Sequence, residues 1–122
     1  MSRPDFHFTR LDVYQVATAF VGAVDVVAAA LPRGRAYLVD QLRRAALSVQ
    51  ANIAEGAGEF SPPDKTRFYR MALRSGTECV ALLESALLLD VNDPAAVEEA
   101  MILLDRIIAM LTRLVRRFGG SG

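Results

Sequence analysis

Polar side chains recur along one flank of a predicted helix near the middle of the chain. Arg44, Ser48, Asn52 and Glu55 are spaced by three and four residues, so on an α-helix they lie in one line, which we call the polar ladder. Their guanidinium, hydroxyl, amide and carboxylate groups can hydrogen-bond a ligand or satisfy polar groups on a neighbouring helix. The second interpretation, in which the ladder fixes helix register, is favoured over a ligand site, and catalysis comes last.

Arginine recurs at helical spacing in two later segments. The positions are Arg67, Arg70 and Arg74 in the first segment, and Arg106, Arg113 and Arg117 in the second. Each set, an arginine stripe, could follow the phosphates of a nucleic acid. The alternative is a solvated helical face with local ion pairs, such as Arg74 with Glu78. The solvated face is the simpler interpretation, and nucleic-acid binding stays open beside it.

Few residues are suited to catalysis or to metal binding. The only cysteine, Cys79, falls on the apolar arc of a predicted helix, and the only histidine, His7, precedes the first helix. A thiol–imidazole pair is therefore not expected. Carboxylate di-metal bundles need Glu-x-x-His pairs on two helices, which one histidine cannot supply. The segment GAGEFS lacks the lysine of a phosphate-binding loop. We expect no enzyme activity, no metal and no cofactor.

The hydrophobic periodicity predicts the elements that position these side chains. Apolar residues recur about every 3.6 positions throughout, and no segment shows the alternation of a strand. Four helices joined by short turns predict an all-α, antiparallel up-down-up-down four-helix bundle. The expected divisions are a flexible N-terminal arm at residues 1–8, one bundle domain at residues 9–118 and a flexible tail at residues 119–122.

Local signals mark the predicted helix ends. Thr9 with Asp12 three residues later predicts a capping box at the start of the first helix. Gly56 and Gly58 predict left-handed residues that end the second helix near residue 55. Ser61, followed by two prolines, predicts the N-cap of the third helix.

The predicted helices carry more apolar surface than one bundle core needs. The surplus consists of Leu47, Ala51 and Ala54 on the second helix and of Leu73, Val80 and Leu87 on the third. Contiguous exposed apolar patches are uncommon on soluble monomers. We therefore predict a homo-oligomer with these residues at its interface. A membrane span is disfavoured for the first helix, because Asp25 interrupts its apolar run and no basic residues flank it.

Charge and cysteine content limit the partners and the compartment. Fourteen basic residues balance fourteen acidic ones, so the protein has no global field that attracts nucleic acid, and any basic site must be local. Thirteen of the fourteen basic residues are arginine, and Lys65 is the only lysine. One cysteine and no signal peptide predict a reducing, cytoplasmic location.

Two segments resemble a known family. They are QLRRAALSVQANIAEGAG at residues 41–58 and FYRMALRSGTECVALLE at residues 68–84, and FTRLDVYQVA at residues 8–17 is similar to the opening of that family. The family is that of the 23S rRNA intervening-sequence proteins, four-helix bundles related to the accessory variability proteins of diversity-generating retroelements. Gln50 stands where the family usually has proline, and Glu59 where a basic residue is common.

The resemblance implies a task that the residues alone do not. It implies a homopentameric ring that holds RNA, DNA or a nucleic-acid enzyme such as a reverse transcriptase. We therefore expect a non-enzymatic, oligomeric helical scaffold or adaptor. The alternative hypothesis is a small-molecule-binding or enzymatic role at the end of the second helix that carries Asn52 and Glu55.

Overall fold

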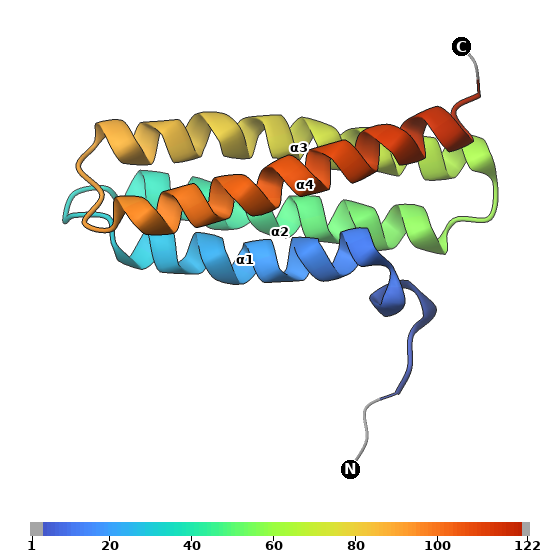
Figure 1. The fold of residues 1–122 in the computed structure, drawn as a ribbon, viewed down its shortest axis with the longest axis horizontal. Coiled ribbons are helices and arrows are strands. Elements are labelled where there is room, and N and C mark those ends of the chain that lie inside the picture. Colours follow the sequence, from blue (N-terminus) through green and yellow to red (C-terminus); the bar gives the residue numbers. More distant parts are fainter. Residues whose placement is uncertain (1–3, 121–122) are drawn as a thin grey trace.

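Four long helices make up the protein (Figure 1), for which a computed structural model describes residues 4–120. They are α1 (Asp12–Ala29), α2 (Ala36–Gly58), α3 (Pro62–Leu88) and α4 (Pro94–Phe118), and a short 3₁₀ helix, η1 (His7–Arg10), precedes α1. Consecutive helices are antiparallel, and α1 also packs against α4, which closes the bundle. The predicted all-α up-down-up-down bundle is confirmed.

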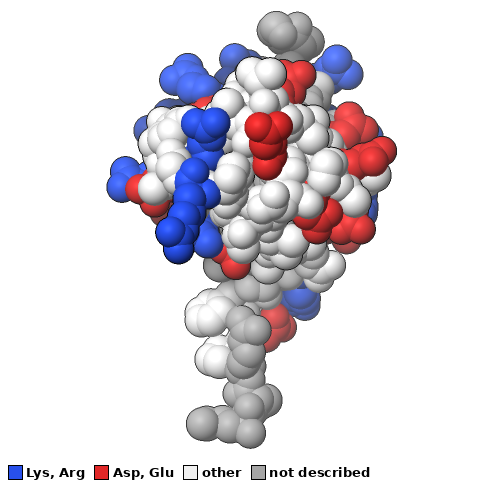
Figure 2. All heavy atoms as spheres, turned by 90° about the vertical axis from the view of Figure 1, so that its left-hand side faces the viewer, with Lys and Arg blue, Asp and Glu red and all other residues white. Residues whose placement is uncertain are grey.

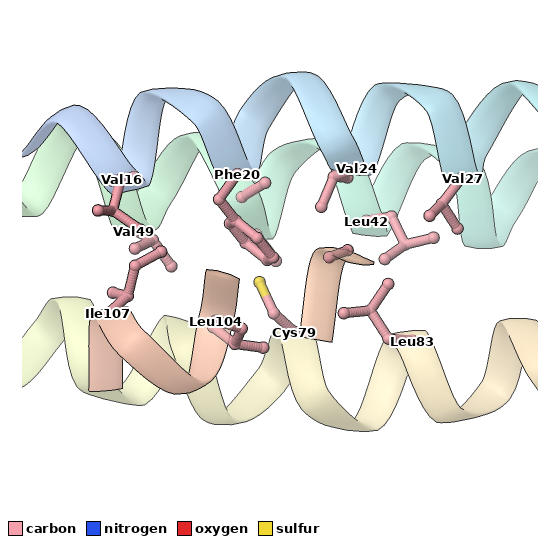
Figure 3. Close-up of a cluster of buried hydrophobic side chains, with 14 of the residues drawn as sticks. Val16, Phe20, Val24, Val27, Leu42, Val49, Cys79, Leu83, Leu104 and Ile107 are labelled. Carbon is pink, nitrogen blue, oxygen red and sulfur yellow. The ribbon is translucent and has the colours of Figure 1, made fainter. Parts of the chain in front are cut away.

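The core follows the apolar stripes that the helical period predicts. On α2 every residue of the predicted stripe is buried, namely Leu38, Leu42, Ala45, Ala46, Val49 and Ile53. Figure 3 shows side chains of α1, including Phe20 and Val24, pointing toward Cys79 and Leu83 of α3. Phe20 is completely buried. Complete burial of a large apolar side chain of this kind contributes about 1.5–3 kcal/mol, so these stripes hold the four helices together.

Side-chain caps fix the starts of α3 and α4. The hydroxyl of Ser61 accepts a hydrogen bond from the backbone N–H of Asp64 at 3.2 Å, which confirms the predicted N-cap. The carboxylate of Asp93 accepts one from the N–H of Ala96 at 3.1 Å. Each cap satisfies a backbone donor that the first turn of a helix would otherwise leave without a partner.

The predicted capping box at Thr9 is wrong. Thr9 lies in η1, where its hydroxyl donates to the carbonyl oxygen of Phe6 at 2.7 Å. Asp12 is the first residue of α1, and Leu11 takes the N-cap position without a side-chain hydrogen bond. The Thr9 hydroxyl, which the sequence pattern assigned to the cap of α1, therefore hydrogen-bonds within the preceding 3₁₀ turn instead.

The two glycines expected to end α2 lie inside it. Neither Gly56 nor Gly58 has a positive φ, and the helix continues to Gly58. Gly56 is buried where α2 approaches α3, and a Cβ added to it would lie 2.7 Å from Cε1 of Tyr69. Glycine is needed at position 56 because the Tyr69 ring occupies the space of a side chain.

Part of the N-terminal segment packs against the bundle. His7 and Phe8, which fall within the predicted flexible arm, belong to η1, and the Phe8 ring packs edge-on against Tyr14 of α1 with centroids 5.0 Å apart. Residues 1–3 of the predicted arm and residues 121–122 of the predicted tail lie outside the described part of the chain. Both chain ends leave the bundle at the same end (Figure 1).

Helix α1 has the length and hydropathy of a membrane span, the one such helix among residues 4–120. It packs against α2 and α4 in the bundle. Its acidic residue Asp25 forms an exposed ion pair with Arg43 of α2, with Nε and Oδ1 3.0 Å apart. The apolar run of α1 thus supplies the bundle core, while Asp25 marks its outer side.

Candidate functional site

The polar ladder is divided between internal partners and solvent. The hydroxyl of Ser48 is 2.8 Å from that of Ser75 on α3, and the amide of Asn52 donates to the carbonyl oxygen of Ser48 at 2.9 Å. Both side chains are half-buried, and Ser48 lies in the seam between α2 and α3. Arg44 and Glu55 are exposed. Ser48 and Asn52 therefore already have hydrogen-bond partners within the protein, and the two charged members face solvent.

The arginine stripe of α3 lies on the surface. Arg67, Arg70 and Arg74 are all exposed. The Arg67 guanidinium is 3.8 Å from the carboxylate of Asp64 and lies 4.7 Å above the Phe68 ring. Within residues 4–120 the ion pairs are Arg10–Asp5, Arg43–Asp25 and Arg67–Asp64, so the predicted pair of Arg74 with Glu78 does not form. Arg70 and Arg74 are thus charged groups on the outer side of α3 with no ion pair among the described residues.

The stripe of α4 is also exposed, and two of its members reach the end of the bundle. Arg106, Arg113 and Arg117 are all solvent-accessible. The guanidinium of Arg117 lies 5.3 Å from the centroid of the Phe118 ring. Figure 2 views the bundle from its other end, which is the left-hand side of Figure 1. On that face basic side chains gather mostly at the left and top, and acidic side chains at the right. The charge is therefore unevenly spread although the chain is neutral overall.

A cavity of about 540 Å³ opens at the end of the bundle where both chain ends leave. It is lined by His7, Leu11, Asp12, Val13, Ala57, Lys65, Tyr69, Met110, Arg113, Leu114, Arg117 and Phe118. Residues from η1 and from all four helices thus meet there. Neither Asn52 nor Glu55 lines it, so the concave surface at this end of α2 lies beyond the residues that the sequence suggested.

Lys65 and Phe118 organise the wall of this cavity. The ammonium group of Lys65 donates to the carbonyl oxygens of Gly56 and Ala57 at 3.3 and 3.1 Å, which caps the last turn of α2. The same ammonium group lies 5.7 Å from the centroid of the Phe118 ring. The centroids of the Tyr69 and Phe118 rings are 6.2 Å apart. Burial raises the pKa of Tyr69 above its ordinary value of 10.0, so its hydroxyl keeps its proton at neutral pH.

The buried thiol of Cys79 is poorly suited to nucleophilic chemistry. Cys79 is completely buried in the core (Figure 3). Burial, together with a smaller contribution from the Glu78 carboxylate, raises the pKa of this thiol to about 12. A thiolate is the reactive form of cysteine, so this group is unreactive at neutral pH. Within residues 4–120, no three groups of the metal-binding types are close enough together to hold a metal ion.

The residues predicted for the oligomer interface lie in different settings. Leu47 and Ala51 of α2 are exposed, Ala54 is half-buried, and Leu87 at the end of α3 is 49% exposed. Leu73 and Val80 are half-buried against the core. Leu47 also lines a groove of about 300 Å³ between α1 and α2, together with Val21 and Gly22. Leu47 and Ala51 of α2 thus face solvent, whereas Leu73 and Val80 of α3 pack against the core of their own bundle.

Comparison with protein families identifies the family of this chain. Residues 9–113 match the family described as 23S rRNA-intervening sequence protein. The chain belongs to this family. A search of curated proteins finds no match. As a member of the 23S rRNA-intervening sequence protein family, the chain has its four helices almost wholly inside the matched region, with the last turns of α4 beyond it.

Sequence reasoning missed the residues that make the cavity of this family member. Lys65, Tyr69 and Phe118 were not singled out as site residues, and only Arg113 and Arg117 were, as parts of a stripe. One signal was present: Lys65 is the only lysine in a chain with thirteen arginines, and it lies in the first turn of α3, just after the short connection from α2. Its role as a helix cap could not be seen without the distance to Ala57.

Proposed function

We propose that this protein is a non-enzymatic, oligomeric helical scaffold of the cytoplasm. It binds RNA or DNA, or a nucleic-acid enzyme such as a reverse transcriptase. The observation that carries the proposal is the exposure of all six stripe arginines on the outer sides of α3 and α4, in a chain whose family description refers to 23S rRNA.

The charge pattern supports binding to phosphates. Of the six stripe arginines, Arg67 alone has an ion pair within residues 4–120. A guanidinium can donate two parallel hydrogen bonds to one phosphate, so exposed arginines in a row can follow a strand. The chain carries no net charge, so one stripe on one protomer binds weakly. Repetition of the stripe around an oligomer adds such contacts together.

The apolar surface supports self-association. Leu47 is 51% exposed in the middle of α2, where it has the exposed Ala51 one turn away and the groove toward α1 beside it. A large apolar side chain in such a position is stabilised when a second protomer covers it. The resemblance to the bundle family implies that five protomers close a ring, and we propose this state for the assembly.

Gel shifts with a structured RNA and a DNA duplex test the proposed nucleic-acid binding. Retention is expected at low salt with roughly 10 μM protein, within the range of non-specific dissociation constants, and should weaken by about 0.7–0.9 log units per log unit of salt for each phosphate contacted. Replacing Arg67, Arg70 and Arg74 together with glutamine should flatten this slope.

A matched control separates the stripe from the loss of charge in general. Arg10, Arg33 and Arg43 are exposed and lie outside α3 and α4, so their replacement with glutamine removes the same charge elsewhere. The control variant should keep the salt slope. Equal flattening in both variants, or no retention of either nucleic acid by the unmodified protein, would remove nucleic acid from the proposal.

A further inference from the structure

The cavity at the end of the bundle has the size and the lining of a small-molecule site. Its volume of about 540 Å³ lies within the range of roughly 300–1,000 Å³ typical of ligand pockets. Apolar side chains, among them Leu11, Met110 and Leu114, make up much of its wall. A few charged groups from different helices converge on the same space. Mostly apolar walls with a few polar groups are the usual composition of a ligand site.

The charged groups of the cavity favour an anion with two negative charges. Lys65, Arg113 and Arg117 are the basic residues that line it, and Asp12 is the one carboxylate among the lining residues. Three positive groups and one negative group leave a net charge of two. A phosphate monoester carries between about −1.5 and −2 at pH 7, which matches this charge. Arginine also binds phosphate through two parallel hydrogen bonds.

The aromatic side chains of the cavity favour an organic group attached to that phosphate. The Phe118 ring is flanked by the Lys65 ammonium at 5.7 Å and by the Arg117 guanidinium at 5.3 Å, and Tyr69 lies beside it. Such cation–π contacts hold both cations at the wall of the cavity. Guanidinium planes and aromatic rings are also the surfaces on which nucleobases stack. A bare phosphate ion would leave these apolar walls without a partner.

Tyr69 adds a neutral hydrogen-bond donor to the same wall. It is only 2% exposed, and it lines the cavity. Its hydroxyl forms no hydrogen bond with the residues that the structure describes. The raised pKa keeps this hydroxyl protonated, so it can donate to an anionic oxygen. The hydroxyl oxygen is not among the enclosed polar atoms of residues 4–120 that lack a partner, so it is open to the cavity and a ligand there can accept its hydrogen bond.

We propose that this cavity binds an aromatic phosphate monoester of the nucleoside monophosphate class. The phosphate lies against Arg113, Arg117 and Lys65, and the base lies against the Phe118 ring and the apolar wall of Leu11, Met110 and Leu114. The source is either a free mononucleotide or the 5′-phosphorylated end of a strand, which present the same chemistry to the cavity. The site is separate from the α3 stripe, but it shares Arg113 and Arg117 with the α4 stripe.

Calorimetric titration of the full chain with AMP, adenosine and inorganic phosphate tests the proposal. AMP is expected to bind at least about tenfold more tightly than adenosine or inorganic phosphate, because each of these lacks half of the contacts. Replacing Arg113 and Arg117 together with glutamine should weaken AMP binding by about tenfold or more. Both side chains are exposed, so the bundle should remain folded.

The control removes the same charge from the same helix. Arg106 and Arg116 lie on α4 and do not line the cavity, so their replacement with glutamine should leave AMP binding unchanged. The proposal is overturned by equal affinity for AMP and adenosine, by equal weakening in the two double variants, or by no AMP binding at millimolar concentration.

Two further titrations identify the source of the ligand and keep this proposal apart from nucleic-acid binding. A short oligonucleotide with a 5′-phosphate that binds more tightly than AMP indicates a strand end, and tighter binding of AMP indicates a free nucleotide. The variant of Arg67, Arg70 and Arg74 should bind AMP normally. A loss of AMP binding in that variant would contradict the separation of the two sites.

Discussion

Replacing Gly56 with alanine should destabilise the bundle although alanine is the better helix former. The added Cβ would lie 2.7 Å from Cε1 and 2.8 Å from Cδ1 of Tyr69, at least 0.6 Å short of the 3.4 Å at which ordinary contact begins. The ring cannot easily move away, because Tyr69 is 2% exposed and packs beside Phe118. Overpacking of this kind costs about 1–3 kcal/mol, which exceeds or cancels the gain of about 1 kcal/mol from helix propensity.

Gly22 supplies the matched control. It lies in the interior of α1, and a Cβ there would meet no atom within 4 Å. Gly22→Ala should therefore stabilise the protein by up to about 1 kcal/mol. The free energy of unfolding of Gly56→Ala should lie at least about 1 kcal/mol below that of Gly22→Ala, because only the first substitution adds a steric cost.

Urea unfolding followed by circular dichroism measures both variants, at one protein concentration because assembly shifts apparent stability. A double-mutant cycle with Tyr69→Leu assigns the cost to the ring: Gly56→Ala should cost less in a chain that already carries Tyr69→Leu than in the wild type. If Gly56→Ala proves as stable as Gly22→Ala, the close approach of α2 and α3 at this point is wrong.

Three further substitutions follow from the contacts in the bundle. Asn52→Ala should lower the free energy of unfolding by about 1 kcal/mol, because it removes the hydrogen bonds to Ser48. Thermal melting measures this loss, and an unchanged melting temperature with a lost ligand or partner would instead assign Asn52 to binding. The neutral thiol of Cys79 contributes stability that is fully present below its ordinary pKa of 9.0 and is lost as the pH rises toward about 12. Wild-type stability should therefore fall more steeply over that window than that of Cys79→Ala, and parallel pH profiles would refute this. Leu47→Asp should weaken self-association without unfolding the bundle, because Leu47 is 51% exposed in the single chain and an interface would bury the new charge.

The repeating features of the fold could be predicted because they are local in sequence. The apolar stripe from Leu38 to Ile53 is visible as a 3.6-residue period, and its burial follows from that period alone. Ser61 was predicted as an N-cap because its partner, the N–H of Asp64, is three residues away. Gly56 was misassigned because the rule that glycine ends a helix uses only local conformation. Its actual constraint is the ring of Tyr69 on the next helix.

The cavity could not be predicted for the same physical reason. Its wall combines Asp12, Lys65 and Phe118, which come from three different helices and meet only after the bundle has closed. Arg113 and Arg117 were recognised as basic residues at helical spacing. The sequence does not show that these two residues line a cavity at the bundle end. It also does not show that Arg106, on the same helix, lies outside that cavity.

Sedimentation velocity of the purified protein tests the central claim most directly. The scaffold account predicts an assembly whose mass is a multiple of the 13.3 kDa chain, five-fold for the proposed ring, at tens of micromolar protein. It also predicts that Leu47→Asp shifts the distribution toward smaller species while the helical circular dichroism signal is kept. A single 13.3 kDa species at every concentration would contradict the account.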